Sequence, residues 1–319
     1  MLTEKHEREN MKIEILLSTY NGERYLDELL NSLLNQTHRD FHITIRDDGS
    51  QDGTRDIIDR YCCEAPERFT LLAGERNLGY PDCFWYLLEH AEKADMYAFC
   101  DQDDVWDEEK LACCCEKCAS ADPNRPLLYV HDYYISNGNL NVNGEYHILE
   151  QGYRADYSYN LIYYVMASGF TMVLNEALRR RVLQGKLYGE GVPHDRWIFW
   201  CGFFVGEIVT DSRLLATYRR HDHTATITGK GNWILLKEWW ENDIRGTRMR
   251  LWETYGNKFV DQYHIEMESR MPGVVSDWRM LLKSRRGAAA YLRRLFFPKR
   301  LKPSLAGELV LRLSFLLNK

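Results

Sequence analysis

The sequence lacks several features that would assign it to common classes of protein. No uninterrupted apolar run approaches the ~20 residues that a membrane span needs, and the most apolar stretch, Trp197–Gly206, is about half that length. No G-x-G-x-x-G motif follows the strand predicted over Lys12–Thr19, which argues against a nicotinamide-dependent dehydrogenase. Residues Met1–Asn10 are polar and mixed in charge, so no signal peptide is evident and we expect a cytoplasmic protein. The sequence also has no internal repeat and no low-complexity linker.

The cysteines point to a reducing compartment. There are nine of them, and four crowd into Cys113–Cys118. A secreted protein seldom leaves such a cluster unpaired. On one predicted helix these four side chains point in divergent directions, so packing as small apolar side chains is favoured over zinc or iron–sulfur ligation. The length of 319 residues and the hydrophobic content of 45% suit one large domain, or one domain with an appendage.

The formal net charge of −6 is unevenly spread. Residues 279–319 contain eleven Lys or Arg against the single acid Glu308, a net of +10, and the remainder (30 basic, 46 acidic) carries −16. Apolar residues such as Leu292 and Phe296 are interleaved with these charges, which predicts a basic amphipathic helix drawn to anionic lipids. Packing of that helix against the acidic part of the chain is the alternative. Nucleic acid is disfavoured, because the acidic remainder would repel phosphates.

Apolar runs and helical periodicity alternate in the first 120 residues. Strands are predicted over Lys12–Thr19, Phe41–Arg46, Phe69–Ala73 and Tyr97–Cys100. Helices are predicted from Tyr25 to Gln36 and over Thr54–Cys62, Pro81–Ala94 and Glu108–Ala119. This alternation has the spacing of right-handed crossover units, so we expect an α/β fold with a mostly parallel central sheet flanked by helices.

The pattern changes after Leu127. Polar residues 133–159 predict loops or edge strands, and a helix is predicted over Asp195–Val205. Further strands are predicted over Leu127–His131, Ala167–Leu174, Ile208–Thr210 and Leu215–Tyr218. From Trp233 onward the chain reads as mostly helical, which predicts a helical C-terminal extension.

Two carboxylate clusters each close a predicted strand. Asp47-Asp48-Gly49-Ser50 follows one strand, and Asp101-Gln102-Asp103-Asp104 follows another about fifty residues later. Strand ends in an α/β sheet face an open crevice where ligands bind. Two acidic clusters in one crevice would repel each other unless a cation lay between them. A divalent metal that carries a nucleotide diphosphate fits this requirement.

Each cluster has a functional and a structural interpretation. Asp101, Asp103 and Asp104 offer the oxygen ligands that Mg²⁺ or Mn²⁺ prefers, or they form a solvated turn that caps the next helix. Asp47 or Asp48 could hydrogen-bond the base or ribose of a nucleotide, or form an Asp-Gly turn, and the spacing does not choose between the two residues.

Three other segments could likewise have either a functional or a structural role. Ser18-Thr19-Tyr20-Asn21-Gly22 could line a nucleotide pocket or form an ordinary strand–turn–helix junction. His194-Asp195 precedes an apolar helix, where Asp195 could be a catalytic base or an N-cap. His221 follows a strand, and a lone histidine is most often structural.

Taken together and in order, these segments resemble family 2 of the glycosyltransferases, which have the nucleotide-diphospho-sugar transferase fold called GT-A. The resemblance covers about residues 11 to 229, and it is closest to the rhamnosyltransferase-like branch. The segments that carry it are Ser18–Gly22, Gln36-Thr37, Asp47–Thr54, Asn77-Leu78-Gly79, Asp101–Trp106, Ser168–Met172, His194-Asp195 and Tyr218–His221. It implies a catalytic domain over 11–229 and a helical, basic extension over 230–319.

The resemblance also implies an inverting transfer by single displacement, with a role for each matched residue. Asp195 corresponds to the catalytic base, which would need a raised pKa or tight geometry because a free Asp has a pKa near ~3.9. Ser168 and Gly169 would lie near the acceptor, and His194 has no assigned role because many relatives have Glu-Asp there. The metal ligands would be Asp101, Asp103, Asp104 and His221. The donor contacts would come from Ser18, Thr19, Tyr20, Asn21, Asp47, Asp48, Asn77, Gly79, Asp101 and Gln102.

We therefore expect a cytoplasmic or peripheral membrane enzyme that moves a sugar onto a cell-surface polysaccharide or lipid-linked oligosaccharide. The favoured donor is dTDP-rhamnose, with a UDP-hexose as the close alternative. A nucleotidyltransferase is disfavoured, because the turn Tyr20-Asn21-Gly22-Glu23 is poor in the Gly and Lys/Arg of a phosphate loop. A non-catalytic nucleotide-sugar-binding protein is the other alternative, and in it Asp195 could be replaced without effect.

Overall fold

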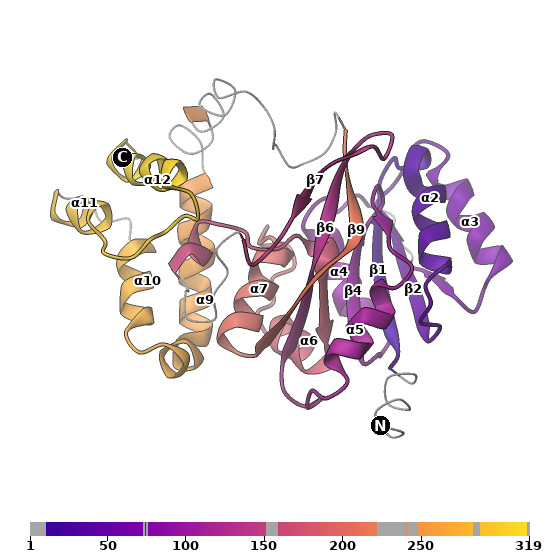
Figure 1. Ribbon diagram of the computed structural model, residues 1–319, viewed down its shortest axis with the longest axis horizontal. Helices are drawn as coiled ribbons and strands as arrows, with labels where there is room; N and C mark the ends of the chain where they lie inside the picture. The colour runs from indigo at the N-terminus through magenta and orange to yellow at the C-terminus, as the bar shows by residue number, and fades with distance from the viewer. Residues whose placement is uncertain are drawn as a thin grey trace. The chain divides into compact units, whose positions relative to one another are not determined.

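The computed structural model describes residues 11–72, 74, 76–150, 159–221, 240–241, 248–282 and 288–317 (Figure 1). The chain forms two compact units. The first comprises Met1–Ile148 and Ala167–Asp222, and the second comprises Leu149–Met166 and His223–Lys319. Residues 149–166 therefore belong with the C-terminal helices rather than with the sheet that surrounds them in sequence.

The first unit is built on one nine-stranded sheet, whose order is β3-β2-β1-β4-β8-β6-β9-β5, with β7 paired to β6. The strands are β1 (Ile13–Thr19), β2 (Phe41–Asp47), β3 (Phe69–Leu71), β4 (Met96–Asp101), β5 (Val105–Trp106), β6 (Leu127–Asn137), β7 (Val142–Tyr146), β8 (Met172–Asn175) and β9 (Glu207–Arg220). Strands β3, β2, β1 and β4 are all parallel, which confirms the arrangement predicted from their crossover spacing. Beyond β4 the sheet is mixed: β8 runs antiparallel to β4 and β6, and β9 is parallel to β6.

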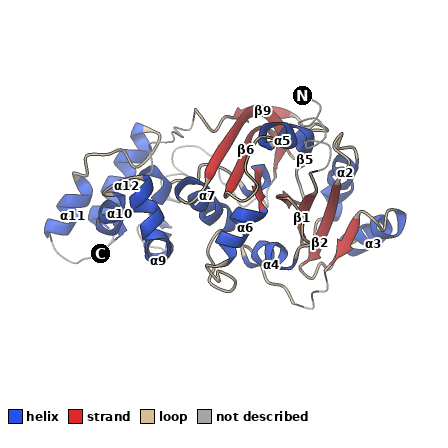
Figure 2. Ribbon diagram, turned by 90° about the horizontal axis from the view of Figure 1, so that it is seen from below, coloured by secondary structure: helices blue, strands red, loops and turns tan. Residues whose placement is uncertain are grey.

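Helices cover both faces of the sheet (Figure 2). Those of the first unit are α2 (Glu23–Leu34), α3 (Thr54–Glu64), α4 (Asp82–His90), α5 (Lys110–Cys118), α6 (Glu176–Leu183) and α7 (His194–Phe204). Alternate residues of β1, such as Ile13 and Ile15, join one core cluster with Leu26 and Leu30 of α2. The residues between them, such as Glu14 and Leu16, point to the other face, because successive side chains of a strand alternate. All four cysteines of Cys113–Cys118 are buried in the same cluster, which confirms that they pack as small apolar side chains.

The strand register places the acidic turns at one edge of the sheet. In the parallel ladders Thr19 pairs with Asp47, and Ser18 pairs with Asp101. Both carboxylate clusters therefore leave the sheet beside the end of β1, as crossover topology requires.

Two expectations for the later strands are wrong. The strands predicted over Ile208–Thr210 and Leu215–Tyr218 are parts of one strand, β9, and register shifts against β6 absorb the polar residues between them. The strand predicted over Ala167–Leu174 begins as a 3₁₀ turn, Gly169–Thr171, and becomes β8 only at Met172. Gly169 and the Thr171 hydroxyl, which donates to the Ser168 carbonyl at 2.7 Å, favour this turn.

The described part of the second unit consists of helices, as predicted, but the basic segment is not one helix; residues 233–239, 242–247, 283–287 and 318–319 of these predictions lie outside the described residues. The second unit contains a short 3₁₀ helix (Tyr159–Ile162), α9 (Arg248–Arg270), α10 (Val274–Leu282), α11 (Ala288–Leu295) and α12 (Leu305–Leu317). Pro298 and Pro303 lie in the break between α11 and α12, where proline removes a backbone donor and ends a helix. Within the residues that the structure describes, no helix combines the length and apolar character needed to cross a bilayer.

Candidate active site

Hydrogen bonds join the turn after β1 to the turns after β2 and β4. Asp47 accepts from the Thr19 hydroxyl at 3.0 Å and from the Ser50 hydroxyl at 2.5 Å. The Gln102 carboxamide accepts from the backbone N–H of Tyr20 at 2.8 Å and donates to its carbonyl at 2.9 Å. A side chain at Gly22 would collide with that carboxamide. Thr19, Asp47 and Gln102 thus hold the turns together, while the Tyr20 side chain is 48% exposed at this edge.

Asn21 adds two hydrogen bonds between the turns after β1 and β2. Its backbone N–H donates to the Ser50 hydroxyl at 2.8 Å, and its side-chain oxygen accepts from the Gln51 N–H at 2.8 Å. Asn21 has a φ of 48°, in the left-handed region that asparagine tolerates better than most residues. The two turns that were predicted to line a nucleotide pocket are therefore one connected structure.

Asp48 fixes the Asn77-Leu78-Gly79 turn. Its carboxylate accepts from the Leu78 N–H at 2.9 Å and from the Gly79 N–H at 2.6 Å. The guanidinium of Arg46 lies 3.2 Å from the same carboxylate, and both side chains are almost fully buried. Gly79 has a φ of 68°, which favours glycine. The structure thus places Asp48 as a support of this turn and leaves the Asn77 side chain exposed at the edge.

The second acidic turn is held by the end of β9. The Arg219 backbone N–H donates to the Asp104 carboxylate at 3.3 Å, and its Nε donates to the Asp103 carbonyl at 2.9 Å. The next residue but one, His221, places its Nε2 at 2.8 Å from the Asp103 carboxylate. Residues more than 110 positions apart are thereby brought together, and three carboxylates and one imidazole share this corner of the sheet.

The carboxylates of Asp101, Asp103 and Asp104 repel one another. Burial, together with the charges of Asp103 and Asp195, raises the pKa of Asp101 to about 7. Burial and the charges of Asp103 and Asp101 raise the pKa of Asp104 well above its usual range. One carboxylate oxygen of Asp104, Oδ2, is buried with no hydrogen-bond partner among the described residues. A bound cation would relieve both the repulsion and the unpaired oxygen, so the chemistry of these residues fits a divalent metal, and the ligand atoms would have to move closer together to hold it.

Lys110 is a buried cation close to this cluster, and no motif in the sequence indicates it. Its Nζ donates to the Phe170 carbonyl at 2.7 Å and lies 3.3 Å from the centre of the Trp106 ring. Burial lowers the pKa of this amine to about 7, and its charge lowers the pKa values of Asp101 and Asp104. A lysine in the first turn of a predicted helix is ordinarily exposed, which is why this role had no signal in the sequence.

Asp195 lies in the first turn of α7, within electrostatic range of Asp101. Its Oδ1 accepts from the Arg196 N–H at 2.7 Å and lies 3.5 Å from the Tyr80 hydroxyl. The Tyr80 side chain is largely exposed, yet partial desolvation of its hydroxyl, followed by the charges of Asp195 and Asp101, raises its pKa. Tyr80 is a site residue that sequence reasoning missed, because it carries no motif of its own.

His194 packs against Phe84 of α4 and lies close to Gly169. It stacks on Phe84 with ring centroids 4.4 Å apart, and burial lowers its pKa to about 4, so the ring is neutral at physiological pH. A Cβ added at Gly169 would lie 2.5 Å from its Nε2. Gly169 therefore borders the helix that carries Asp195, and Ser168 precedes it in the chain.

Comparisons with known proteins identify the family of this chain. The sequence profile of glycosyl transferase family 2 matches residues 14–179, more than half of the chain. An uncharacterised glycosyltransferase of Nostoc sp. is 31% identical over 226 residues, which cover 66% of this chain and 65% of that protein. The dTDP-rhamnosyl transferase RfbG of Shigella flexneri is 33% identical over 98 residues, 30% of this chain and 34% of its own length. The chain thus spans between a third and two thirds of these curated relatives.

Solved structures show the same fold. The Staphylococcus aureus TarS fragment 1–349, in complex with UDP-GlcNAc, has a TM-score of 0.55 at 17% identity, covering 89% of this chain and 88% of that one. The mannosyltransferase PcManGT of Pyrobaculum calidifontis, in complex with GDP-Man and Mn²⁺, has a TM-score of 0.50 at 14% identity, covering 97% and 87%. The predicted GT-A fold is confirmed. The chain belongs to glycosyl transferase family 2.

Proposed function

We propose that this chain is an inverting, metal-dependent glycosyltransferase. The observation that carries the proposal is that Asp195 lies within electrostatic range of the strand-end acid Asp101, which Asp103 also influences. A proton acceptor and a cluster suited to a metal diphosphate are the two parts that such a transfer needs. The catalytic domain would span residues 11–229.

In this mechanism Asp195 takes the proton of an acceptor hydroxyl as the hydroxyl oxygen attacks the anomeric carbon. The bond from that carbon to the diphosphate breaks in the same step, and the nucleoside diphosphate leaves with the electron pair, so the anomeric configuration inverts. Asp101, Asp103, Asp104 and His221 would hold Mg²⁺ or Mn²⁺, which stabilises the charge of the leaving diphosphate when bound. Lys110, buried behind the acids, offsets part of their repulsion.

For the donor side, Tyr20 is the exposed aromatic side chain that would contact the base, and Asn77 would offer an exposed amide from the turn that Asp48 supports. Ser18, Thr19, Asn21, Asp47, Asp48, Gly79 and Gln102 would shape the pocket around them. We favour dTDP-rhamnose as the donor, on the motif pattern and on the likeness to RfbG, with a UDP-hexose as the alternative. The acceptor would be a cell-surface polysaccharide or a lipid-linked oligosaccharide that reaches Asp195 past Ser168 and Gly169.

Calorimetry with a panel of nucleotide sugars, with and without Mn²⁺, tests the donor class. We expect Mn²⁺-dependent binding of dTDP-rhamnose, and a weakening of at least about 10-fold in Asp103→Asn, because loss of even an outer-shell partner of a metal costs about 10–100-fold. A preference for a UDP-sugar would discard rhamnose and keep the transferase. Failure of the folded protein to bind any nucleotide sugar would contradict the proposed function.

We also propose that the second unit contacts an anionic membrane surface. The exposed leucines of α12, Leu305, Leu309, Leu313, Leu316 and Leu317, recur at helical spacing along one face. Phe296 is 73% exposed beside exposed Lys299 and Arg300. Exposed apolar side chains next to cations are characteristic of membrane-surface helices.

Co-sedimentation with vesicles containing phosphatidylglycerol tests this contact. Burial of one leucine contributes about 1.5–3 kcal/mol, so the double variant Leu309→Glu/Leu313→Glu should bind at least about tenfold more weakly. The matched control Leu251→Glu changes an exposed leucine of α9 and should bind normally. Equal binding by the double variant and the wild type, or no binding by either, would contradict the proposal.

A further inference from the structure

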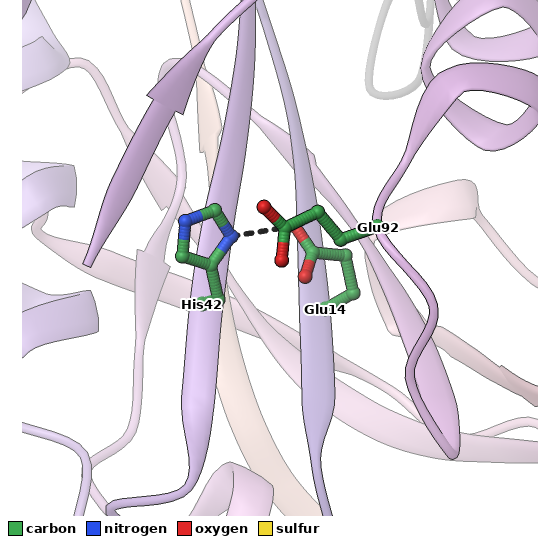
Figure 3. Close-up of side chains that lie close together, drawn as sticks. All are labelled: Glu14, His42 and Glu92. Carbon is green, nitrogen blue, oxygen red and sulfur yellow. Dashed lines mark hydrogen bonds and ion pairs between the residues drawn. The ribbon is translucent and has the colours of Figure 1, made fainter. Parts of the chain in front are cut away.

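A second group of metal-ligand side chains lies at the other edge of the sheet. Glu14 is near the start of β1, His42 near the start of β2, and Glu92 follows α4 just before β4. Their ligand atoms all lie within 4.8 Å of one another. Among the described residues, no other three His, Cys, Asp or Glu side chains meet this condition, including those of the Asp101–Asp104 turn. Figure 3 shows the two carboxylates and the imidazole converging on one spot.

Strand register explains how the chain builds this group. Glu14 and His42 are paired residues of the parallel β1–β2 ladder, and both point to the face opposite the main core cluster. The carboxylate oxygen Oε1 of Glu14 lies 2.9 Å from the Nδ1 of His42. These two residues are therefore fixed by the sheet, and Glu92 is the third, solvent-facing member.

An unsatisfied carboxylate oxygen points to a ligand. Glu14 is fully buried, and its Oε2 has no hydrogen-bond partner in the described part of the chain. A buried carboxylate oxygen that lacks a partner is costly, and a second carboxylate nearby adds repulsion. The Lys12 amine does lie 3.2 Å from Glu92, but this ion pair is exposed to solvent, and Glu14 Oε2 remains without a partner among the described residues.

The surrounding hydroxyls complete the pattern of a metal site. The Thr44 hydroxyl donates to Glu14 Oε1 at 2.5 Å, and the Thr70 hydroxyl lies 3.2 Å from His42 Nε2. A ligating histidine typically has its second nitrogen oriented by such a hydrogen bond, and ligating carboxylates are hydrogen-bonded in turn. In this structure Nδ1 of His42 hydrogen-bonds Glu14 Oε1, so a bound cation would replace the proton between these two atoms.

We propose that Glu14, His42 and Glu92 form a binding site for a divalent transition-metal cation, with Zn²⁺ as the closest chemical match. One imidazole and two carboxylates suit Zn²⁺ better than Mg²⁺, which prefers oxygen ligands alone. The site lies at the start of the strands, whereas the acids of the proposed transferase centre lie at their ends. It joins β1 and β2 to the segment that follows α4, so the cation stabilises the folded first unit rather than acting on the donor. The inference does not rest on the proposed function.

Calorimetric titration with Zn²⁺ tests the site, with Cys63→Ser as the background so that the exposed thiol does not compete. A further Asp103→Asn change removes one ligand of the proposed donor-metal site, so that this site binds Zn²⁺ more weakly. In this background we expect one Zn²⁺ per chain and a rise in Tm, with both effects lost in Glu92→Gln and in His42→Gln. Thr70→Val should weaken binding about tenfold, because it removes only the outer hydrogen bond.

The exposed Glu92 keeps the test interpretable, since its replacement does not disturb the core even if His42→Gln fails to fold. Absence of Zn²⁺ binding in the Asp103→Asn background would overturn the inference. Zn²⁺ binding that is unchanged by Glu92→Gln would also overturn it. Neither result bears on donor binding, which the nucleotide-sugar panel measures separately.

Discussion

Asp195→Asn should lower kcat about 10³-fold while leaving donor affinity unchanged. Asparagine keeps the size of the side chain and an oxygen that can accept from the Arg196 N–H, but it cannot accept a proton. Positioned general bases contribute about 10²–10⁴-fold to a rate. The measurement is the release of nucleoside diphosphate from the donor, with water or a saccharide as the acceptor, alongside calorimetric donor binding.

Tyr80→Phe is the matched control for this prediction. It removes the hydroxyl that lies 3.5 Å from the Asp195 carboxylate and leaves the base itself in place. We expect a loss much smaller than that of Asp195→Asn. Retention of the full rate in Asp195→Asn would remove Asp195 from the mechanism and would favour a non-catalytic nucleotide-sugar-binding protein.

Asp48→Ala should destabilise the first unit by about 3–5 kcal/mol, the cost of removing one partner of a buried ion pair. The substitution leaves Arg46 buried without its counter-charge and leaves the amides of Leu78 and Gly79 unpaired. Because those amides position the turn beside the donor pocket, donor affinity should fall as well. Urea unfolding measures the first effect, and calorimetry measures the second.

Two further variants separate charge from hydrogen bonding at this site. Asp48→Asn keeps one acceptor oxygen and should cost less than Asp48→Ala. The double variant Arg46→Met/Asp48→Ala removes the unpaired charge and should recover part of the stability. A loss below about 1 kcal/mol in Asp48→Ala, in the range of an exposed ion pair, would contradict the buried-pair account.

Local patterns were enough to predict the parallel half of the sheet. The alternation of apolar strands with amphipathic helices such as Tyr25–Leu34 has few solutions other than right-handed crossovers, and these bring strand ends to one edge. The patterns failed where a single strand carries polar residues, as at Asp211-Ser212-Arg213 in β9. There, pairing with β6 and the contacts of Asp211 with Arg213 and the Tyr129 hydroxyl maintain the strand despite its sequence.

The candidate site was predictable only in part for a similar reason. Acids at strand ends are visible as motifs, so Asp101 and Asp103 could be named from the sequence. His221 was named from the resemblance, whereas the contacts of Arg219 with the Asp103-Asp104 turn and the buried charge of Lys110 depend on segments that meet only in the folded chain. Asp48 was predicted as a nucleotide contact or turn residue, but its bonds to a turn thirty residues away depend on tertiary structure alone.

The most direct test of the central claim is a crystal structure with a nucleoside diphosphate and Mn²⁺, in which anomalous scattering locates the metal. The account predicts an anomalous peak in contact with the diphosphate and with Asp103 and His221, with Tyr20 against the base. A diphosphate bound at this edge without Mn²⁺ at Asp103, or a nucleotide bound elsewhere on the chain, would contradict it.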